Sequence, residues 1–325
     1  MKKIIILSSI LITLFSNLFA TSAKYSDENF TLDFEYNDIL IPGDAIFARM
    51  KITTPKSHKK LKTENERKAV LQLYNDKKVI ESSPFYTISK KKNTTTIEML
   101  SGLPISTWIT EGNFSLKVVF NLGDDDKDKE FTLPITFQSR EFNQEDIPLD
   151  QKNTEIRSDN SPQRAKQIEK LNNILFTSMP DDVYNLKAFT YPTESKRYTA
   201  YFGDRRKYIY SNGKSSTSLH YGNDLGIPEG SSVTSCAEGR VVMAENRITT
   251  GYSIVIEHLP GLYSLYYHLS EMKVQEGDYV KQGQLIGKSG STGLATGPHL
   301  HWEIRLNGTA VRPEFFVRNF TFEEL

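Results

Sequence analysis

Residues 296–304 read Thr-Gly-Pro-His-Leu-His-Trp-Glu-Ile, and from His299 onward polar and apolar side chains alternate. In an extended strand, alternate side chains share a face of the sheet. One face therefore carries His299, His301 and Glu303. The other face is apolar throughout, and it carries Leu300, Trp302 and Ile304. This pattern predicts a strand whose apolar face packs in a core and whose histidine face is available for chemistry.

Histidine is scarce, and five of the six histidines follow residue 219. A second group with metal-ligand spacing is His220-Tyr221-Gly222-Asn223-Asp224. Along a straight strand, His220 and Asp224 would lie about 13 Å apart. Sharing an ion therefore requires a bend, which Gly222 permits. Two histidines and one aspartate match the three protein ligands of many catalytic zinc sites, which leave one position for water.

Hydrolysis at such a site also needs a general base. The chain has no HExxH motif, so the surplus histidines are the candidates. His268 stands near the end of the alternating run 262–269, and strand ends commonly carry active-site residues. An HxH pair alone is weak evidence, but its combination with the other histidines is more specific.

Several separated motifs follow one another in a fixed order: His220-x-x-x-Asp224, Tyr267-His268-Leu269-Ser270, Gly290-Ser291-Thr292-Gly293 and the segment 296–303. Together they resemble the signature of the lysostaphin/LytM-type zinc metallopeptidases, family M23, from about Tyr201 to Pro313. The resemblance also takes in the upstream sequence Gly203-Asp204-Arg205-Arg206. It implies a C-terminal antiparallel β-sheet peptidase domain over residues 181–325.

The resemblance implies a role for each of five residues. His220, Asp224 and His301 would bind one Zn²⁺ ion. His268 and His299 would act in catalysis, by activating the water or stabilising the developing oxyanion. The implied function is a zinc metalloendopeptidase that cuts peptidoglycan stem peptides or crossbridges.

Three other interpretations compete for this part of the chain. A catalytically silent LytM-like module would regulate other cell-wall hydrolases by binding them, but retention of all five residues counts against it. Residues 274–287 resemble the hairpin of lipoyl and biotinyl domains, yet a carrier would not explain the histidines. Cys236 with a histidine would suit a cysteine peptidase, but its segment reads as a strand with a buried thiol. His258 is interpreted as structural because the metal count is complete without it.

The N-terminal half shows a different pattern. Residues 24–140 contain short alternating runs separated by turn residues, which predicts an Ig-like antiparallel β-sandwich. The acidic stretch 123–130 is interpreted as a solvated hairpin tip rather than a calcium site. The Lys-rich stretch 56–68, with His58, is interpreted as a solvated loop.

Residues 141–180 are interpreted as a polar linker with a short helix that begins after Ser161-Pro162. Such a linker would let the sandwich and the helix near 161–176 swing and restrict the catalytic groove. Intramolecular regulation by the N-terminal domain is therefore a hypothesis.

The start of the chain has the pattern of an export signal. A basic Met1-Lys2-Lys3 precedes an apolar run and small residues, which predicts a signal peptide over residues 1–20. An uncleaved anchor is the alternative. We therefore expect an exported protein that is periplasmic or associated with the cell envelope.

Composition narrows the class of protein. The 40 basic and 40 acidic residues give no net charge, so nucleic acid is not expected as a partner. Cys236 is the single cysteine, which excludes an intrachain disulfide. Peptidoglycan is the expected partner, and it follows from the resemblance.

Overall fold

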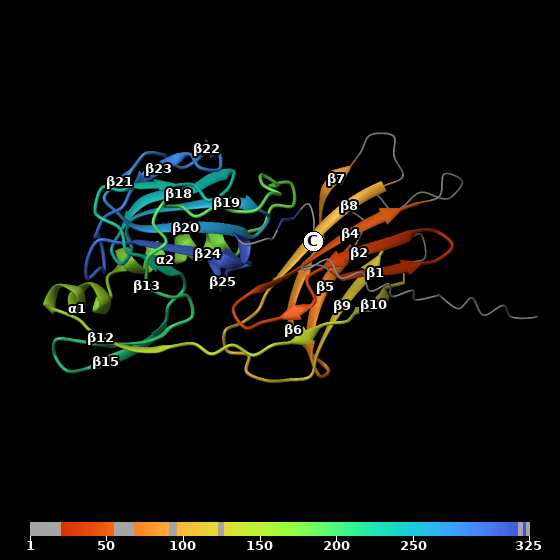
Figure 1. Ribbon diagram of the computed structural model, residues 1–325, viewed down its shortest axis with the longest axis horizontal. Coiled ribbons are helices and arrows are strands. Elements are labelled where there is room, and N and C mark those ends of the chain that lie inside the picture. Colours follow the sequence, from red (N-terminus) through yellow and green to blue (C-terminus); the bar gives the residue numbers. More distant parts are fainter. Residues whose placement is uncertain (1–20, 55–67, 91–95, 123–126, 318–320, 323–325) are drawn as a thin grey trace, which may run out of the picture.

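A computed structural model describes residues 21–54, 68–90, 96–122, 127–317 and 321–322 (Figure 1). The predicted signal peptide, His58 and residues 123–126 of the acidic hairpin lie outside the described residues. Among the helices that the structure describes, none is long and apolar enough to cross a membrane.

The N-terminal half is a sandwich of two antiparallel sheets. The first sheet has the order β1 (Thr21–Ser26), β2 (Thr31–Tyr36), β4 (Ala45–Thr53), β8 (Thr96–Pro104) and β7 (Tyr86–Lys90). The second has the order β10 (Lys129–Leu133), β9 (Phe114–Asn121), β5 (Lys68–Asn75) and β6 (Lys78–Pro84). The short strands β3 (Ile39–Leu40) and β11 (Thr136–Phe137) pair in parallel beside them.

The alternating runs explain this sandwich. Leu71 and Leu73 of β5, and Leu116 and Val118 of β9, are fully buried in a core shared with β2, β4 and β8. Every second residue of these strands therefore packs between the sheets. The prediction of a mostly β chain with an N-terminal antiparallel sandwich is confirmed, whereas the Ig-like topology stays a prediction.

The C-terminal half is built on a larger sheet. Its order is β13 (Tyr198–Ala200), β16 (Asn223–Leu225), β24 (Leu300–Leu306), β20 (Leu262–Leu269), β19 (Gly251–Leu259), β18 (Gly239–Arg247) and β22 (Tyr279–Val280), with β25 (Thr309–Val311) beside β24. A small sheet of β17 (Ser232–Thr234), β23 (Leu285–Lys288) and β21 (Glu271–Met272) packs on it. The 3-10 helix η1 (Pro313–Phe316) follows β25.

Helix α2 (Pro162–Leu175) covers the other face of the large sheet. Ser161 caps it, accepting a hydrogen bond from the backbone N–H of Arg164 at 3.2 Å. Leu171, Ile174 and Leu175 pack against a cluster that includes Tyr263 and Met243. The helix predicted after Ser161-Pro162 is thus confirmed.

The chain before α2 is part of the fold and does not act as a free linker. Strand β12 (Gln144–Pro148) pairs in parallel with β14 (Arg205–Ile209), which in turn pairs with β15 (Ser215–Leu219). Helix α1 (Gln151–Ser158) follows at once, with Asp150 as its N-cap. The polar composition of this segment pointed to a linker, but its backbone groups are paired by the neighbouring strand and by the cap.

The two halves lie side by side (Figure 1). Asp44 of the sandwich side, whose side chain is 5% exposed, accepts hydrogen bonds from Arg140 and from Arg312 Nε, both at 2.7 Å. Phe47 packs its ring against Phe316 and Phe322 of the C-terminal half. A buried ion pair and an aromatic cluster therefore fix the orientation of the sandwich.

Candidate metal centre

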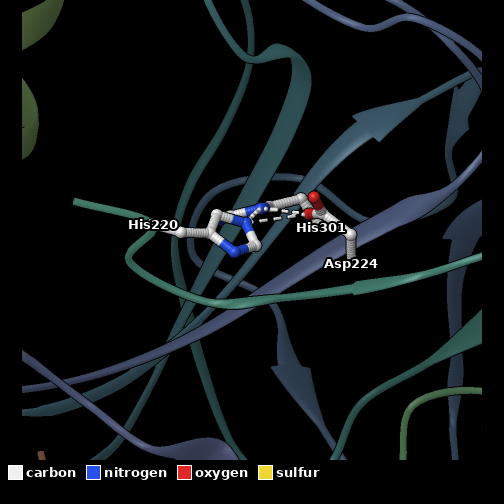
Figure 2. Close-up of side chains that lie close together, drawn as sticks. All are labelled: His220, Asp224 and His301. Atoms are coloured by element: carbon white, nitrogen blue, oxygen red, sulfur yellow. Dashed lines mark hydrogen bonds and ion pairs between the residues drawn. The ribbon is translucent and has the colours of Figure 1, made fainter. Parts of the chain in front are cut away.

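Three predicted ligand residues come together at the join of two strands. His220 directly follows β15, Asp224 lies in β16, and His301 lies in β24, where it is the register partner of Asp224. His220 Nε2 is 3.1 Å from both Asp224 Oδ1 and His301 Nδ1. His301 Nδ1 is 2.7 Å from the same Oδ1 (Figure 2). The three ligand atoms all lie within 4.8 Å of one another, so they form a His/Asp cluster able to hold a metal ion.

Gly222 explains how His220 and Asp224 meet. A Cβ at this position would lie 2.3 Å from the carbonyl oxygen of Trp302. Glycine therefore lets the chain turn against the backbone of β24. The bend that the sequence required occurs where it was predicted.

In each histidine, the ring nitrogen that does not face Asp224 forms a hydrogen bond with another group. His220 Nδ1–H donates to the carbonyl of Tyr201 at 2.7 Å, and His301 Nε2–H donates to Glu303 Oε1 at 2.9 Å. The other nitrogen of each ring lies beside Asp224 Oδ1 (Figure 2). With a metal ion bound, each ring in its neutral tautomer would offer the lone pair of that nitrogen as a ligand. Two lone pairs and a carboxylate oxygen that converge on one buried point match the donor set of a divalent cation such as zinc.

The carboxylates are held in their ionised form. Burial opposes the charge on Asp224, but the contacts with His220 and His301 hold its pKa well below its ordinary value. Burial also lowers the pKa of His301, but its bonds to Asp224 and Glu303 outweigh this and raise it to about 9. Glu303, buried between His301 and Arg305, has its pKa lowered to about 2 because these partners outweigh burial. The site therefore contains two ionised carboxylates, Asp224 and Glu303, on either side of His301.

Two supporting residues were missed by the sequence analysis. Arg206 of β14 donates from Nη2 to Asp224 Oδ2 at 2.8 Å, so the carboxylate keeps Oδ1 toward the histidines. Glu303 orients His301 and is itself held by Arg305 Nε at 2.7 Å. The place of Glu303 on the histidine face was a usable signal. Arg206 also had a signal, because it ends the quoted sequence Gly203-Asp204-Arg205-Arg206, but its contact with Asp224 depends on how β14 lies over the site.

The two predicted catalytic histidines lie beside the cluster. His268 Nδ1 bonds the carbonyl of Thr292 at 2.7 Å, and His299 Nδ1 bonds the carbonyl of Gly297 at 2.8 Å. Their ring centroids are 4.8 Å apart, and His268 is 6.1 Å from His301. Burial, and then the neighbouring His299 and His301, lower the pKa of His268 to about 3.

His268 also has a strained backbone, with φ of 60°. Its backbone N–H donates a hydrogen bond to the carbonyl of Thr250 at 2.9 Å, which holds this conformation.

All five residues singled out from the sequence line a single cavity of about 450 Å³, which we call the metal cleft. One wall of that cavity comes from β12 and α1, through Glu145, Ile147 and Arg157.

The residues set aside in the sequence lie in the core. Cys236 and His258 are both fully buried, with Sγ 3.8 Å from Nε2. His258 bonds Ser264 Oγ and the carbonyl of Glu238, each at 2.7 Å. Burial raises the pKa of the Cys236 thiol to about 11 and lowers that of His258 to about 4, so both are neutral. The structural interpretation of both residues holds.

The fold and the site define a β protein of two halves, with a buried His/Asp cluster that is able to hold a metal ion and lines a cleft. Residues 218–313 match the family model of Peptidase family M23, so the chain carries an M23 peptidase domain. A likeness of fold extends over both halves. A Pseudomonas aeruginosa protein of known structure, described as a candidate M23 peptidase, aligns with a TM-score of 0.54 and 17% identity, covering 87% of this chain and 96% of that one.

Curated relatives align over the peptidase domain. Peptidoglycan DD-endopeptidase ShyA of Vibrio cholerae is 38% identical over 122 residues, 37% of this chain and 28% of that protein. DD-carboxypeptidase/endopeptidase Mpg of Neisseria meningitidis is 42% identical over 95 residues, 29% of this chain and 22% of that protein. Stage II sporulation protein Q of Bacillus subtilis is 42% identical over 104 residues, 31% of this chain and 37% of that protein. The matched segment thus spans less than two fifths of each of these relatives.

Proposed function

We propose that this protein is an exported zinc metalloendopeptidase that hydrolyses peptide bonds in peptidoglycan stem peptides or crossbridges. The observation that carries the proposal is the convergence of His220 Nε2, Asp224 Oδ1 and His301 Nδ1, with each histidine anchored through its other nitrogen. The names of the relatives ShyA and Mpg support the substrate class. Export rests on the pattern of residues 1–20 alone.

The chain's own groups match the steps of amide hydrolysis. When bound, a zinc ion supplies Lewis acidity, which polarises the scissile carbonyl and lowers the pKa of a water molecule. His268 and His299 each donate Nδ1–H to a backbone carbonyl, so Nε2 of each ring is the nitrogen available to accept a proton. The lowered pKa of His268 makes it the weaker acceptor, and His299 Nε2 lies 3.8 Å from Asp224 Oδ1, so His299 is the proposed base for the attacking water. A ring that has accepted the proton then donates a hydrogen bond to the oxyanion or delivers the proton to the leaving amine.

The test compares wild-type protein lacking residues 1–20 with His301→Ala on intact peptidoglycan, with products read by mass spectrometry. Wild type with zinc should convert crosslinked fragments to uncrosslinked ones, and the new termini identify the bond. His301→Ala and a chelator-treated sample should release nothing. Release of the same products by His301→Ala would contradict the proposal.

A silent module that binds and regulates other hydrolases is the second candidate. The similarity to stage II sporulation protein Q supports this second candidate, because the name of that relative states no peptidase activity. The complete set of five residues in one cleft counts against it. Absence of zinc in the purified protein, together with absence of products, would favour the silent module.

Intramolecular regulation stays a proposal, but the structure changes which element it concerns. Within the described chain, no residue of α2 lines the metal cleft, so the helix near 161–176 does not restrict the groove directly. Segment 144–157 does line it, through residues of β12 and α1. This lining supports a proposal in which β12 and α1 restrict the groove directly, and the sandwich would act on the groove through them.

A further inference from the structure

A second hollow of about 820 Å³ lies between the two halves of the molecule. It shares Arg206, Ser218, Leu219 and Tyr221 with the metal cleft, so the two hollows meet at these residues. The sandwich side contributes Trp108 and its neighbours, and the peptidase side contributes β14 and the turn between β24 and β25. Residues 144 and 146 of β12 line this hollow, whereas residues 145 and 147 line the metal cleft, so the two hollows lie on opposite faces of that strand. A substrate bound at the metal centre would reach the sandwich by extending past the shared residues.

Trp108 is a large aromatic side chain displayed in this hollow. Its side chain is 68% exposed, the third-highest exposure among the large hydrophobic residues that the structure describes. The guanidinium carbon of Arg205 lies 3.8 Å from the centroid of the ring, and Arg205 Nη2 donates to the carbonyl of Thr107 at 2.7 Å. The peptidase half thus fixes the position of Trp108 while leaving much of its surface open.

Tyr221 repeats this arrangement at another position in the lining of the hollow. It is 42% exposed, and the guanidinium carbon of Arg305 lies 4.3 Å from its ring centroid. Arg305 is in turn bonded to Glu303, which orients His301. The hollow therefore contains two exposed aromatic rings, each supported on one face by an arginine.

The remaining lining indicates which ligand suits these rings. The nitrogens Nη1 and Nη2 of Arg205 already bond the backbone and hydroxyl of Thr107 and the carbonyl of Gly203, so they are not presented to a ligand carboxylate. The charged side chains of the other lining are paired, Lys207 with Asp146 at 3.9 Å and Arg206 with Asp224 at 2.8 Å. Neutral groups supply the rest, with the amide of Gln144 and the hydroxyls of Ser106, Thr107, Thr217, Ser218 and Thr309. Open aromatic faces combined with hydroxyls suit a sugar ring, whose C–H face packs on an aromatic ring and whose hydroxyls exchange hydrogen bonds.

We propose that this hollow is a binding subsite for a sugar unit of the peptidoglycan glycan strand, with Trp108 as its platform. The inference rests on the proposed function, because the glycan strand is the part of peptidoglycan that carries the stem peptides. The subsite is preformed, since Asp44, Arg140 and Arg312 dock the two halves. Sugar binding there presents the attached peptide to the metal centre.

A binding experiment tests the subsite without requiring catalysis. The chain has two tryptophans, and Trp302 is fully buried, so acrylamide quenching reports on Trp108. Soluble glycan strands stripped of peptides should protect Trp108 from acrylamide, and a crosslinked stem-peptide dimer without sugars should not. Protection by the sugar-free dimer alone, or by neither probe, would overturn the proposal.

A kinetic experiment compares two substrates: the crosslinked dimer with its sugars and the same dimer without them. Trp108→Ala should lower kcat/KM on the sugar-bearing dimer about five- to tenfold, the size of one aromatic contact. It should leave kcat/KM on the sugar-free dimer unchanged, and Trp108→Phe should retain most of the activity.

Tyr279→Ala is the matched control, because Tyr279 is 69% exposed but lies outside both hollows. It should change neither rate. An equal loss on both dimers in Trp108→Ala would overturn the sugar subsite. If wild type cleaves neither dimer, the proposed function fails, while the quenching result still decides whether the sugar binds.

Discussion

At the scale of single residues, the metal cluster depends on groups that hold the ligands in place. Asp224 offers Oδ1 to the histidines because Arg206 takes Oδ2, and His301 offers Nδ1 because Glu303 takes Nε2–H. Outer partners of this kind orient metal ligands and raise their affinity for the metal. Arg206 and Glu303 are therefore expected to matter for zinc binding as well as for catalysis.

We predict that Arg206→Ala weakens zinc affinity about 10- to 100-fold. The reason is loss of the 2.8 Å bond that orients Asp224. Competition with a chromophoric zinc chelator measures the affinity directly. Lys207→Ala is the control, because that neighbouring side chain is 50% exposed and contacts only Asp146 among the ion pairs of the described chain. Equal affinities for Arg206→Ala and wild type would remove Arg206 from the site.

A second residue-scale prediction concerns Glu257, far from the metal cluster in the sheet order. Burial, and then the neighbouring Asp182, raise its pKa to about 7. Its carboxyl therefore stays protonated in the folded protein after it has ionised in the unfolded chain, so folding loses stability as pH rises from about 4.5 to about 7. The full effect is up to about 3 kcal/mol.

Glu257→Gln keeps a neutral side chain at every pH. We expect its free energy of unfolding, relative to wild type, to be higher at pH 8 than at pH 5. Urea denaturation at the two pH values measures the difference. A constant difference between the two proteins would show that the pKa of Glu257 is not raised.

At the scale of elements, the turn between β15 and β16 determines whether the ligands meet. Gly222 passes so close to β24 that a Cβ would fall 2.3 Å from the carbonyl oxygen of Trp302. Backbone atoms of a central strand yield little, because the interior is closely packed. The turn can therefore not accept a side chain without displacing Asp224 from His301.

We predict that Gly222→Ala lowers the free energy of unfolding by about 1–3 kcal/mol, as overpacking does. It should also abolish tight zinc binding. Thermal unfolding and zinc competition measure the two effects. Gly297→Ala is the matched control for stability, because a Cβ there meets nothing within 4 Å. Wild-type zinc affinity in Gly222→Ala would contradict this view of the turn.

At the scale of the whole molecule, the sandwich and the peptidase half behave as one docked unit. Asp44 is nearly buried and accepts hydrogen bonds from both Arg140 and Arg312, so its removal leaves both partly exposed arginines without this partner. The docking also places Trp108 over Arg205. The geometry of the second hollow therefore depends on this interface.

We predict that Asp44→Ala destabilises the docked arrangement by about 1–3 kcal/mol, because two charge-assisted hydrogen-bonded pairs are lost while both arginines keep partial access to water. Faster proteolysis between the halves and a larger radius of gyration in solution scattering are the expected results. Asp33→Ala serves as control, because the side chain of Asp33 is 44% exposed and pairs only with Lys24 among the ion pairs of the described residues. Unchanged scattering in Asp44→Ala would show that the aromatic cluster suffices for docking.

Sequence alone determined what depends on short-range pattern. Period-two alternation predicted the strands, Ser161-Pro162 predicted α2, and motif spacing selected five residues that the structure brings into one cleft. These features are local, because each follows from side chains only a few positions apart. Their metal-binding and catalytic roles stay predictions for the experiments above.

Only the tertiary structure decided how distant segments support the cleft. Segment 144–157 forms a cleft wall, although its polar composition indicated a linker. Arg206 reaches Asp224, and Trp108 meets Arg205 across 97 positions of the chain (205 minus 108). Such contacts leave no periodic trace in the sequence, because they arise from the docking of whole sheets and from pairing between strands remote along the chain.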